Sequence, residues 1–517
     1  MPYKFEQTIK GKTYVYEITS YWDKKKKQPR QIRKYIGKKH PDTGKIIPPH
    51  RNIKNIRIKT CKDFGNIYFL NSIANKIHLI DTIKKVFPHL WKEIITTVFF
   101  EISEKKPMYL CNNFIDSAAI EYVKQLSSQR ISELFKQLGE SIQQRIIFFK
   151  EWIKKRNDFN FLVFDITSLS SYSKLNEYVE WGYNRDNEKL PQINLGLIFG
   201  EPSGLPIFYK TYEGSICDVT TLDNIFKYIE YLKVRNILFI LDKGFYSRYN
   251  LMKMNEKKKK FLISVPFSVK ITKELIEKNK KKINDIEKAF QINKQILYGV
   301  KNKVIIDGTD FWAYIYYDEI RMITAKTELI KRVLEIEKKV KQINFREEKK
   351  IREYMKETLK GWDKIFKIER GKLGFSLRRR EEKIKQIIEK MGYTVLLSNI
   401  EFTSQDAIEL YRKKDGIEKL FNVIKNELGE RRLWVDSYEG MEGRLFITFM
   451  SLIIYSWIKK VMKEKNLYTK YTVEEVIYEL KKIKRIEIGE GQILYTELTK
   501  RQKDLFEAFG IEKPFST

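Results

Sequence analysis

A chain of 517 residues, 42% of them hydrophobic, can bury several cores and is expected to fold into about two to four globular units. Lysine and arginine outnumber aspartate and glutamate by 100 to 67, and the net charge of +33 favours a polyanion such as nucleic acid as partner, although an AT-rich genome produces a similar lysine excess. The three cysteines lie far apart and the four histidines share no metal-ligand spacing, which argues against a disulfide framework and zinc chemistry and favours a cytoplasmic location.

Residues 1–60 are predicted to form a basic, β-rich N-terminal arm. Polar and apolar side chains alternate in TYVYEIT, which is typical of a strand. A basic cluster follows before proline and glycine turn signals, and its members are Lys24, Lys25, Lys26, Lys27, Arg30, Arg33 and Lys34. The run Gly11, Lys12, Thr13 resembles the end of a phosphate-binding loop, but the glycine required five positions earlier is Glu6, so no nucleotide cofactor is expected.

Residues 61–156 have a helical pattern and are predicted to form a DNA-binding domain. In AIEYVKQLSSQRISELFKQLG, Ser127 or Ser128 can cap a helix from Gln129 to Leu138. Two helices joined by a tight turn can read DNA as a helix-turn-helix. Ordinary helical packing is the alternative interpretation of the same pattern.

Between residues 157 and 267 the pattern changes to short apolar runs. Strands are predicted at NFLVFDIT, QINLGLIF, LPIFYKTY, NILFILD and KFLISVPF, with a helix at VTTLDNIFKYIEYL. The resulting order, β-β-β-α-β-α-β, predicts an α/β layer with a mixed sheet, which presents functional side chains at one edge.

A Lys/Glu-rich stretch from 268 to 391 interrupts this pattern and is predicted to be an inserted domain. The sheet pattern resumes in residues 392–460 with the strand GYTVLLSN, and Phe402–Leu428 is predicted as one long helix capped near Thr403 or Ser404. The apolar run Leu445–Ile458 is too short to span a bilayer and is expected to be a buried helix, so no membrane contact is expected. Residues 461–517 are predicted to form a C-terminal helical tail.

Two predicted strands end in a carboxylate. Asp165 follows the most apolar run, and Asp242 ends LFILD directly before Lys243 and Gly244. Two acids at strand tips can meet across a sheet edge, where a hard cation such as Mg²⁺ takes oxygen ligands and keeps positions open for phosphates. For either residue alone, an aspartate that caps the next turn is the simpler interpretation.

The predicted helix adds a third acid and a specific pattern. At helical spacing, four polar residues fall within one sector of about 60°, and they are Tyr411, Lys414, Glu418 and Lys425. Apolar residues occupy the adjacent sector, so the helix can pack on a core beside this stripe. A carboxylate flanked by ammonium groups and a phenol suits a site for metal and phosphate, while a merely exposed Lys/Glu face is the alternative.

This stripe resembles the Tyr-Arg-Glu-Lys signature of bacterial insertion-sequence DDE transposases of the IS-four superfamily. In that signature the four residues are separated by two, three and six positions, and here Lys414 stands where arginine is usual. The resemblance extends over most of the chain, through RKYIGKKHPDTG, FDITS around Asp165, GYNRDNEKLPQINLGL from Gly182 and LDKGFYS around Asp242. Lysine keeps the charge of arginine but loses its bidentate hydrogen-bonding geometry.

The resemblance implies an RNase H-like mixed-sheet catalytic core, formed by residues 157–267 and 392–460 and interrupted by the insertion domain 268–391. It implies that Asp165, Asp242 and Glu418 bind two Mg²⁺ or Mn²⁺ ions and catalyse cleavage and strand transfer of DNA. The implied partners are double-stranded DNA, both terminal inverted repeats and target, and a second copy of the chain in a synaptic dimer at the bacterial nucleoid. The residues expected to hold the DNA backbone are Tyr411, Lys414, Lys425 and Lys243.

Two other functions fit parts of the same pattern. An RNase H-like nuclease would cut DNA without strand transfer, and the additional DNA-binding regions argue against it. A DNA-binding protein derived from a transposase would have no chemical reason to keep Asp165, Asp242 and Glu418 together.

Overall fold

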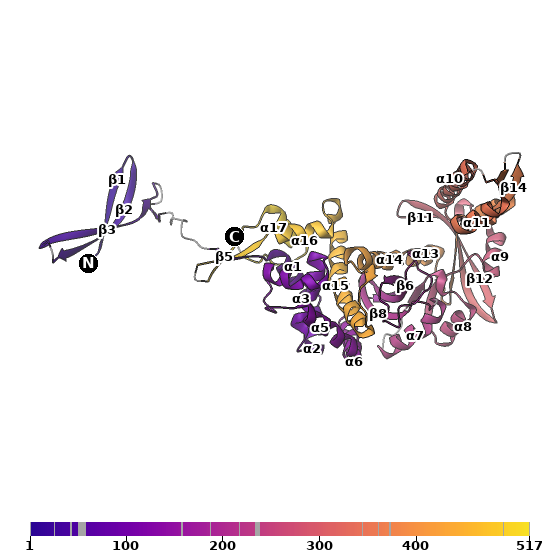
Figure 1. Ribbon diagram of the computed structural model, residues 1–517, viewed down its shortest axis with the longest axis horizontal. Helices are drawn as coiled ribbons and strands as arrows, with labels where there is room; N and C mark the ends of the chain where they lie inside the picture. The colour runs from indigo at the N-terminus through magenta and orange to yellow at the C-terminus, as the bar shows by residue number, and fades with distance from the viewer. Residues whose placement is uncertain are drawn as a thin grey trace. The chain divides into compact units, whose positions relative to one another are not determined.

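The computed structural model describes residues 2–24, 26–41, 44–49, 58–156, 159–186, 188–216, 218–232, 238–343, 345–359, 361–371, 374–489 and 491–515 (Figure 1). The chain divides into two compact units. The first comprises Met1–Lys62 and Lys484–Thr496, and the second comprises Asp63–Ile483 and Glu497–Thr517.

The described residues of the first unit form two small sheets. One has the order β1-β2-β3-β4, with strands Tyr3–Ile9, Lys12–Asp23, Gln28–Lys39 and Ile46–Ile47. The other has the order β19-β18-β5, with strands Gln492–Tyr495, Lys484–Ile488 and Ile58–Asp63. The basic cluster predicted in the arm is exposed at Lys24, Lys26, Lys27, Arg30, Arg33 and Lys34, whereas Lys25 lies outside the described residues.

The strands β18 and β19 differ from the helix expected throughout residues 461–517. Arg485–Ile488 pair with Gln492–Tyr495 in antiparallel register. Gly489 and Gly491 have φ values of 54° and 99°, the left-handed region that glycine adopts without steric cost, so the chain turns back on itself here. The expectation of helix is therefore wrong for this part of the segment.

A group of helices forms one part of the second unit. Their bounds are α1 Gly65–Lys76, α2 Leu79–Val86, α3 Trp91–Glu104, α4 Cys111–Ser117, α5 Ser128–Glu140, α6 Ile142–Lys154, α15 Tyr438–Glu464, α16 Val473–Lys481 and α17 Lys500–Ala508. The side chain of Ser127 accepts a hydrogen bond from the Arg130 N–H, which confirms the predicted cap of α5.

A mixed sheet of ten strands forms the other part. Its order is β11-β12-β13-β16-β10-β9-β6-β7-β8, with β17 paired to β6. The bounds are β6 Phe159–Ser171, β7 Gln192–Pro202, β8 Leu205–Glu213, β9 Leu238–Leu241, β10 Lys260–Ser264, β11 Ala289–Ile292, β12 Gln295–Ile306, β13 Thr309–Tyr317, β16 Tyr393–Ser398 and β17 Arg432–Leu433.

The central part of the sheet follows the predicted order. Helix α7, Asp218–Tyr231, connects β8 to β9, and α8, Arg248–Glu256, connects β9 to β10. β6, β9 and β10 are parallel neighbours, whereas β6, β7 and β8 are antiparallel. The first nine residues of β7 are all buried, which explains why these strands read as continuous apolar runs.

The range 268–391, expected to be an inserted domain, contains two kinds of structure. Helix α9, Lys270–Asn279, is followed by β11, β12 and β13, which extend the large sheet. The later elements share a separate hydrophobic cluster and are α10 Glu319–Ile343, α11 Glu348–Thr358, β14 Phe366–Gly371, β15 Gly374–Arg379 and α12 Glu381–Ile388.

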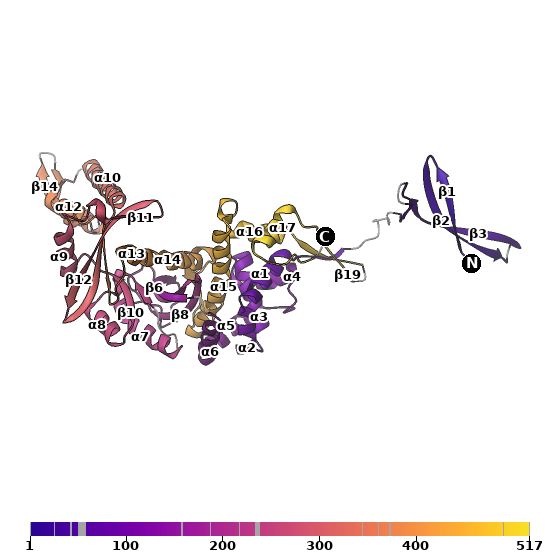
Figure 2. The same ribbon diagram turned by 180° about the vertical axis from the view of Figure 1, so that it is seen from behind.

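Helix α15 lies between the helices and the sheet of the second unit (Figure 2). Among the described residues it is the one helix long and apolar enough to cross a membrane, and 83% of its most apolar stretch is buried inside the protein. Glycines let it approach α5 closely. A Cβ at Gly443 would lie 1.8 Å from the Phe135 carbonyl oxygen, and one at Gly139 would lie 1.9 Å from that of Glu439.

We expect Gly443→Ala to destabilise the second unit, because the added methyl group has to push two helix backbones apart. The expected loss is about 1–3 kcal/mol, the usual cost of overpacking a core. It is measured as a lower midpoint of urea unfolding. Gly371→Ala is the control, since a Cβ there meets its nearest atom, the Gly374 oxygen, at 3.6 Å. Equal midpoints for the two variants would contradict the tight α5–α15 contact.

Candidate active site

Asp165 on β6 and Asp242, directly after the adjacent parallel strand β9, lie at the same level of the sheet. Val163 of β6 pairs with Ile240 of β9, and each acid follows two residues later. β9 ends at Leu241, as expected for a strand that ends before Asp242. The strand end expected at Asp165 is wrong, because the residues that follow it continue to pair with β7. Asp165 therefore lies inside β6, beside the point where β9 stops.

One oxygen of each aspartate is held by hydrogen bonds. The Ile166 N–H donates to Asp165 Oδ1 at 2.9 Å. The Lys243 N–H and the Tyr411 hydroxyl donate to Asp242 Oδ1 at 2.7 and 3.1 Å. These bonds fix the two carboxylates and leave the Oδ2 atom of each for a cation.

The segment that carries Glu418 is not the single helix expected from Phe402 to Leu428. It consists of α13, Ser404–Arg412, then α14, Asp415–Asn422, and a π-helical turn, Val423–Glu427. The side chain of Thr403 caps α13, as predicted. The helix breaks because backbone N–H groups at the junction bond to carbonyls three residues earlier instead of four, and these donors are Lys414, Gly416 and Ile417.

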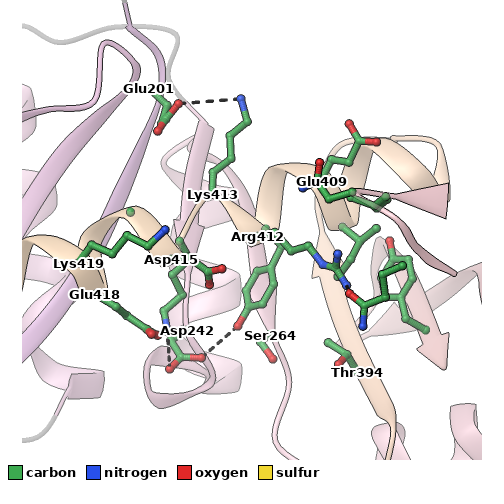
Figure 3. Close-up of a pocket in the computed structure, with 18 of the residues that line it drawn as sticks. Glu201, Asp242, Ser264, Thr394, Glu409, Arg412, Lys413, Asp415, Glu418 and Lys419 are labelled. Carbon is green, nitrogen blue, oxygen red and sulfur yellow. Dashed lines mark hydrogen bonds and ion pairs between the residues drawn. The ribbon is translucent and has the colours of Figure 1, made fainter. Parts of the chain in front are cut away.

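The Lys414 ammonium lies among the three acids. Its Nζ is 3.0 Å from Asp242 Oδ2, 3.1 Å from Glu418 Oε1 and 3.7 Å from Asp165 Oδ2. The Lys414 side chain is only 10% exposed. Figure 3 shows Glu418 and Asp242 turned toward each other from α14 and from the end of β9. One cation thus holds together carboxylates from three separate elements.

Burial and charge act against each other on these groups. Burial raises the pKa of Asp165 to about 6, although the Lys414 ammonium opposes that shift. For Asp242, burial also favours the protonated form, but the charge and hydrogen bond of Lys414, together with the hydrogen bonds from the Lys243 N–H and Tyr411, lower the pKa. Burial alone would lower the pKa of Lys414, and the carboxylates of Asp165 and Asp242 raise it instead. The site therefore holds its positive charge firmly and one of its negative charges weakly.

The other residues expected in the site lie differently. Glu418 is 61% exposed and reaches Lys414, and the Lys243 side chain is exposed beside Asp242. Lys425, expected on the same helical stripe, instead forms an ion pair of 2.7 Å with Asp186 and is 11% exposed. Lys425 lies in the π-helical turn that follows α14, and its role in holding DNA stays a prediction.

Sequence reasoning did not single out Arg185 and Asp186, which lie between β6 and β7. Arg185 Nη1 is 3.2 Å from the Ser168 hydroxyl, and its charge lowers the pKa of Asp165, after larger contributions from burial and Lys414. Asp186 holds Lys425. In the sequence they appear only as a charged pair inside GYNRDNEKLPQ, and their position beside Asp165 and Lys425 depends on the fold.

A groove of about 1860 Å³ opens beside the acids and is lined by Asp242, Tyr411, Lys414 and Glu418. Basic side chains line much of it, among them Lys243, Arg321, Arg412, Lys413, Lys419, Lys459, Lys460 and Lys463. Lys413 points toward Glu201, which also lines the groove (Figure 3). Acidic side chains line it as well, and they are Glu201, Asp242, Asp318, Glu409, Asp415, Glu418 and Glu464, so the basic groups are in slight excess.

The chemistry of the three acids suits a divalent cation. Within the part of the chain that the structure describes, no three acidic, histidine or cysteine side chains are close enough to hold a metal ion as they lie. However, Asp165, Asp242 and Glu418 offer only oxygen ligands, which Mg²⁺ and Mn²⁺ prefer, and all three already face one cation, Lys414. The donor set therefore fits such an ion.

The raised pKa of Asp165 has a consequence for stability. The folded chain holds this proton more tightly than the unfolded chain, whose pKa is near 3.8, so stability falls as the pH rises from about 4 to about 6. Asp165→Asn removes that cost and is expected to stabilise the chain by roughly 1–3 kcal/mol at pH 7 in EDTA, and by much less at pH 4. The measurement is the midpoint of urea unfolding against pH.

Glu418→Gln is the control for this prediction, because its exposed carboxylate contacts the same ammonium without the cost of burial. If Asp165→Asn raises the free energy of unfolding by the same amount at pH 4 and pH 7, burial of the Asp165 charge is not the cause.

The sequence was compared with known protein families, curated proteins and solved structures. Residues 156–454, more than half of the chain, match a family model described as the transposase DDE domain. No curated protein matches the sequence. Among solved structures, the chain is similar to a piggyBac transposase synaptic complex with hairpin DNA, with 10% identity, a TM-score of 0.35 and coverage of 86% of this chain and 77% of that one. On the strength of the family match, the chain belongs to the DDE-domain transposases.

Proposed function

We propose that the chain is a cut-and-paste DNA transposase of the IS-four superfamily, which binds the ends of its insertion sequence and cleaves and transfers DNA strands. The observation that carries this proposal is the convergence of Asp165, Asp242 and Glu418 on one cation beside a basic groove. We further propose that it acts as a synaptic dimer in the bacterial cytoplasm.

The strand arrangement around the acids supports an RNase H-like catalytic core. Three antiparallel strands, β8, β7 and β6, are followed by the parallel strands β9 and β10, and the two aspartates lie on and directly after the neighbouring strands β6 and β9. In this proposal the core spans 157–267 and 392–460 and the insertion spans 268–391. Residues 1–60 and 61–156 bind DNA, and 461–517 form a C-terminal extension.

The acids would hold a pair of Mg²⁺ or Mn²⁺ ions. Such ions activate water or a 3′-hydroxyl and stabilise the leaving oxygen in an in-line attack on phosphate. Asp165 and Asp242 would each supply the Oδ2 atom that their backbone hydrogen bonds leave open, and the exposed Glu418 would close the site from α14. Tyr411 orients Asp242 through its hydroxyl.

Basic residues near the acids would hold the DNA backbone. Lys243 and Lys414 line the groove, and their ammonium groups suit phosphate oxygens. Lys425 forms an ion pair with Asp186 and so stabilises the Arg185–Asp186 segment. This ion pair would have to break before Lys425 could contact a phosphate. These assignments separate the residues that hold metal from those that hold DNA.

Replacing Asp165, Asp242 or Glu418 by alanine is expected to abolish DNA cleavage and leave DNA binding largely intact. The measurements are nicking of a labelled duplex that carries the inverted repeats flanking the gene, in Mg²⁺, and a gel shift of the same duplex. Glu409→Ala is the control, because this carboxylate lines the same groove from α13 without contacting Lys414 in any described interaction. A variant that still cleaves removes its residue from the site, and cleavage without joining to target DNA would favour the nuclease.

DNA binding is expected to weaken steeply with salt, because lysine and arginine side chains release counter-ions when they neutralise phosphates. Replacing the exposed Lys24, Lys26 and Lys27 together by glutamine should reduce the slope of log affinity against log salt by roughly 2–3 if all three contact phosphates. An unchanged slope would mean that this cluster is only solvated.

A further inference from the structure

The Lys414 ammonium faces one carboxylate oxygen of each of the three acids. Asp165 Oδ1 and Asp242 Oδ1 already accept backbone hydrogen bonds, and it is the two Oδ2 atoms that face the Lys414 ammonium. Glu418 gives its Oε1 to the same ammonium. The ammonium lies within hydrogen-bond distance of Asp242 and Glu418, at 3.0 and 3.1 Å, and forms a longer ion pair of 3.7 Å with Asp165.

We propose that Lys414 is an internal counter-ion, which neutralises the acids while divalent ions are absent and leaves them when ions bind. Its ammonium is then free to contact a phosphate of the substrate, and this last step rests on the proposed function as a DNA transposase. Lys414 would thus couple the binding of divalent ions by the acids to the binding of DNA phosphate.

The acids cannot hold Lys414 and a metal ion with the same oxygens. A divalent ion requires oxygen ligands at about 2.0–2.2 Å and would carry a like charge next to the ammonium in a largely buried position. The Oδ2 atoms of Asp165 and Asp242 accept no backbone hydrogen bond and are the oxygens best placed to bind an ion. An ion that binds both of them takes the place of the Lys414 ammonium.

The position of Lys414 in the chain permits that movement. It lies at the junction between α13 and α14, and its flexible four-carbon stem can change rotamer without unwinding either helix. Lys414 also lines the groove that runs beside the acids, together with Lys413 and Lys419. A released ammonium would therefore enter a surface already suited to phosphate.

The first test measures Mn²⁺ affinity of the full chain without DNA by titration calorimetry. Lys414→Met removes the competing charge and is expected to bind Mn²⁺ about tenfold more tightly than wild type. Lys414→Arg keeps the charge and should stay close to wild type, as should the control Lys338→Met, an exposed lysine of α10 that does not line the groove. Asp242→Asn identifies the part of the signal that belongs to this site.

Equal or weaker Mn²⁺ binding by Lys414→Met would overturn the proposal, since Lys414 would then organise the acids for the ion instead of competing with it. Tighter binding by Lys414→Arg as well would show that charge is not the cause. These outcomes do not depend on DNA, so they stand even if the proposed function fails.

The second test measures the salt dependence of binding to a double-stranded DNA of mixed sequence, with and without Ca²⁺, which takes the same oxygen ligands. With Ca²⁺, wild type should have a slope steeper by about one than Lys414→Met, because its released ammonium contacts one phosphate. Without Ca²⁺ the two slopes should be equal. A difference between the variants that is the same in both conditions, or no difference in either, would overturn the release of Lys414 to DNA.

Discussion

Carboxylates that face one point repel one another, and the second unit is built so that a cation offsets this repulsion. The pairing of Val163 with Ile240 fixes the two aspartates at one level, while α14 brings Glu418 from a segment far along the chain. Lys414 supplies the opposing charge from within the site. The arrangement of the acids therefore depends on a positive charge among them, whether that charge is an ammonium group or a bound ion.

The frame around the acids is held by buried ionic contacts. Beyond the π-helical turn, Glu430 forms an ion pair with Arg444 of α15, and Arg444 also lies 3.1 Å from Glu101 of α3. The Glu430–Arg444 pair connects the segment that follows Glu418 to α15. Helix α15 in turn packs closely on α5 at Gly443. Removing one partner of such a buried pair leaves an uncompensated charge, which is costly in a core.

Local sequence patterns predicted the strands and the position of Asp242, because apolar runs and a strand-end acid depend on neighbouring residues. The continuation of β6 from Thr167 to Ser171 was missed, because the polar residues there bond to groups far away in the sequence. Ser168, for example, donates a hydrogen bond to the Tyr183 carbonyl. The helical wheel placed Lys414 beside Glu418 but could not predict that it lies among all three acids. The Lys425 ion pair with Asp186 likewise depends on tertiary structure.

Asp165, Asp242 and Glu418 are proposed to form a divalent-metal site. The most direct measurement is anomalous X-ray scattering from crystals of the full chain grown with Mn²⁺. We expect a peak within about 2.5 Å of the Oδ2 atoms of Asp165 and Asp242, with the Lys414 ammonium moved away from both. Crystals that contain Mn²⁺ elsewhere, with Lys414 still bridging the acids, would contradict it.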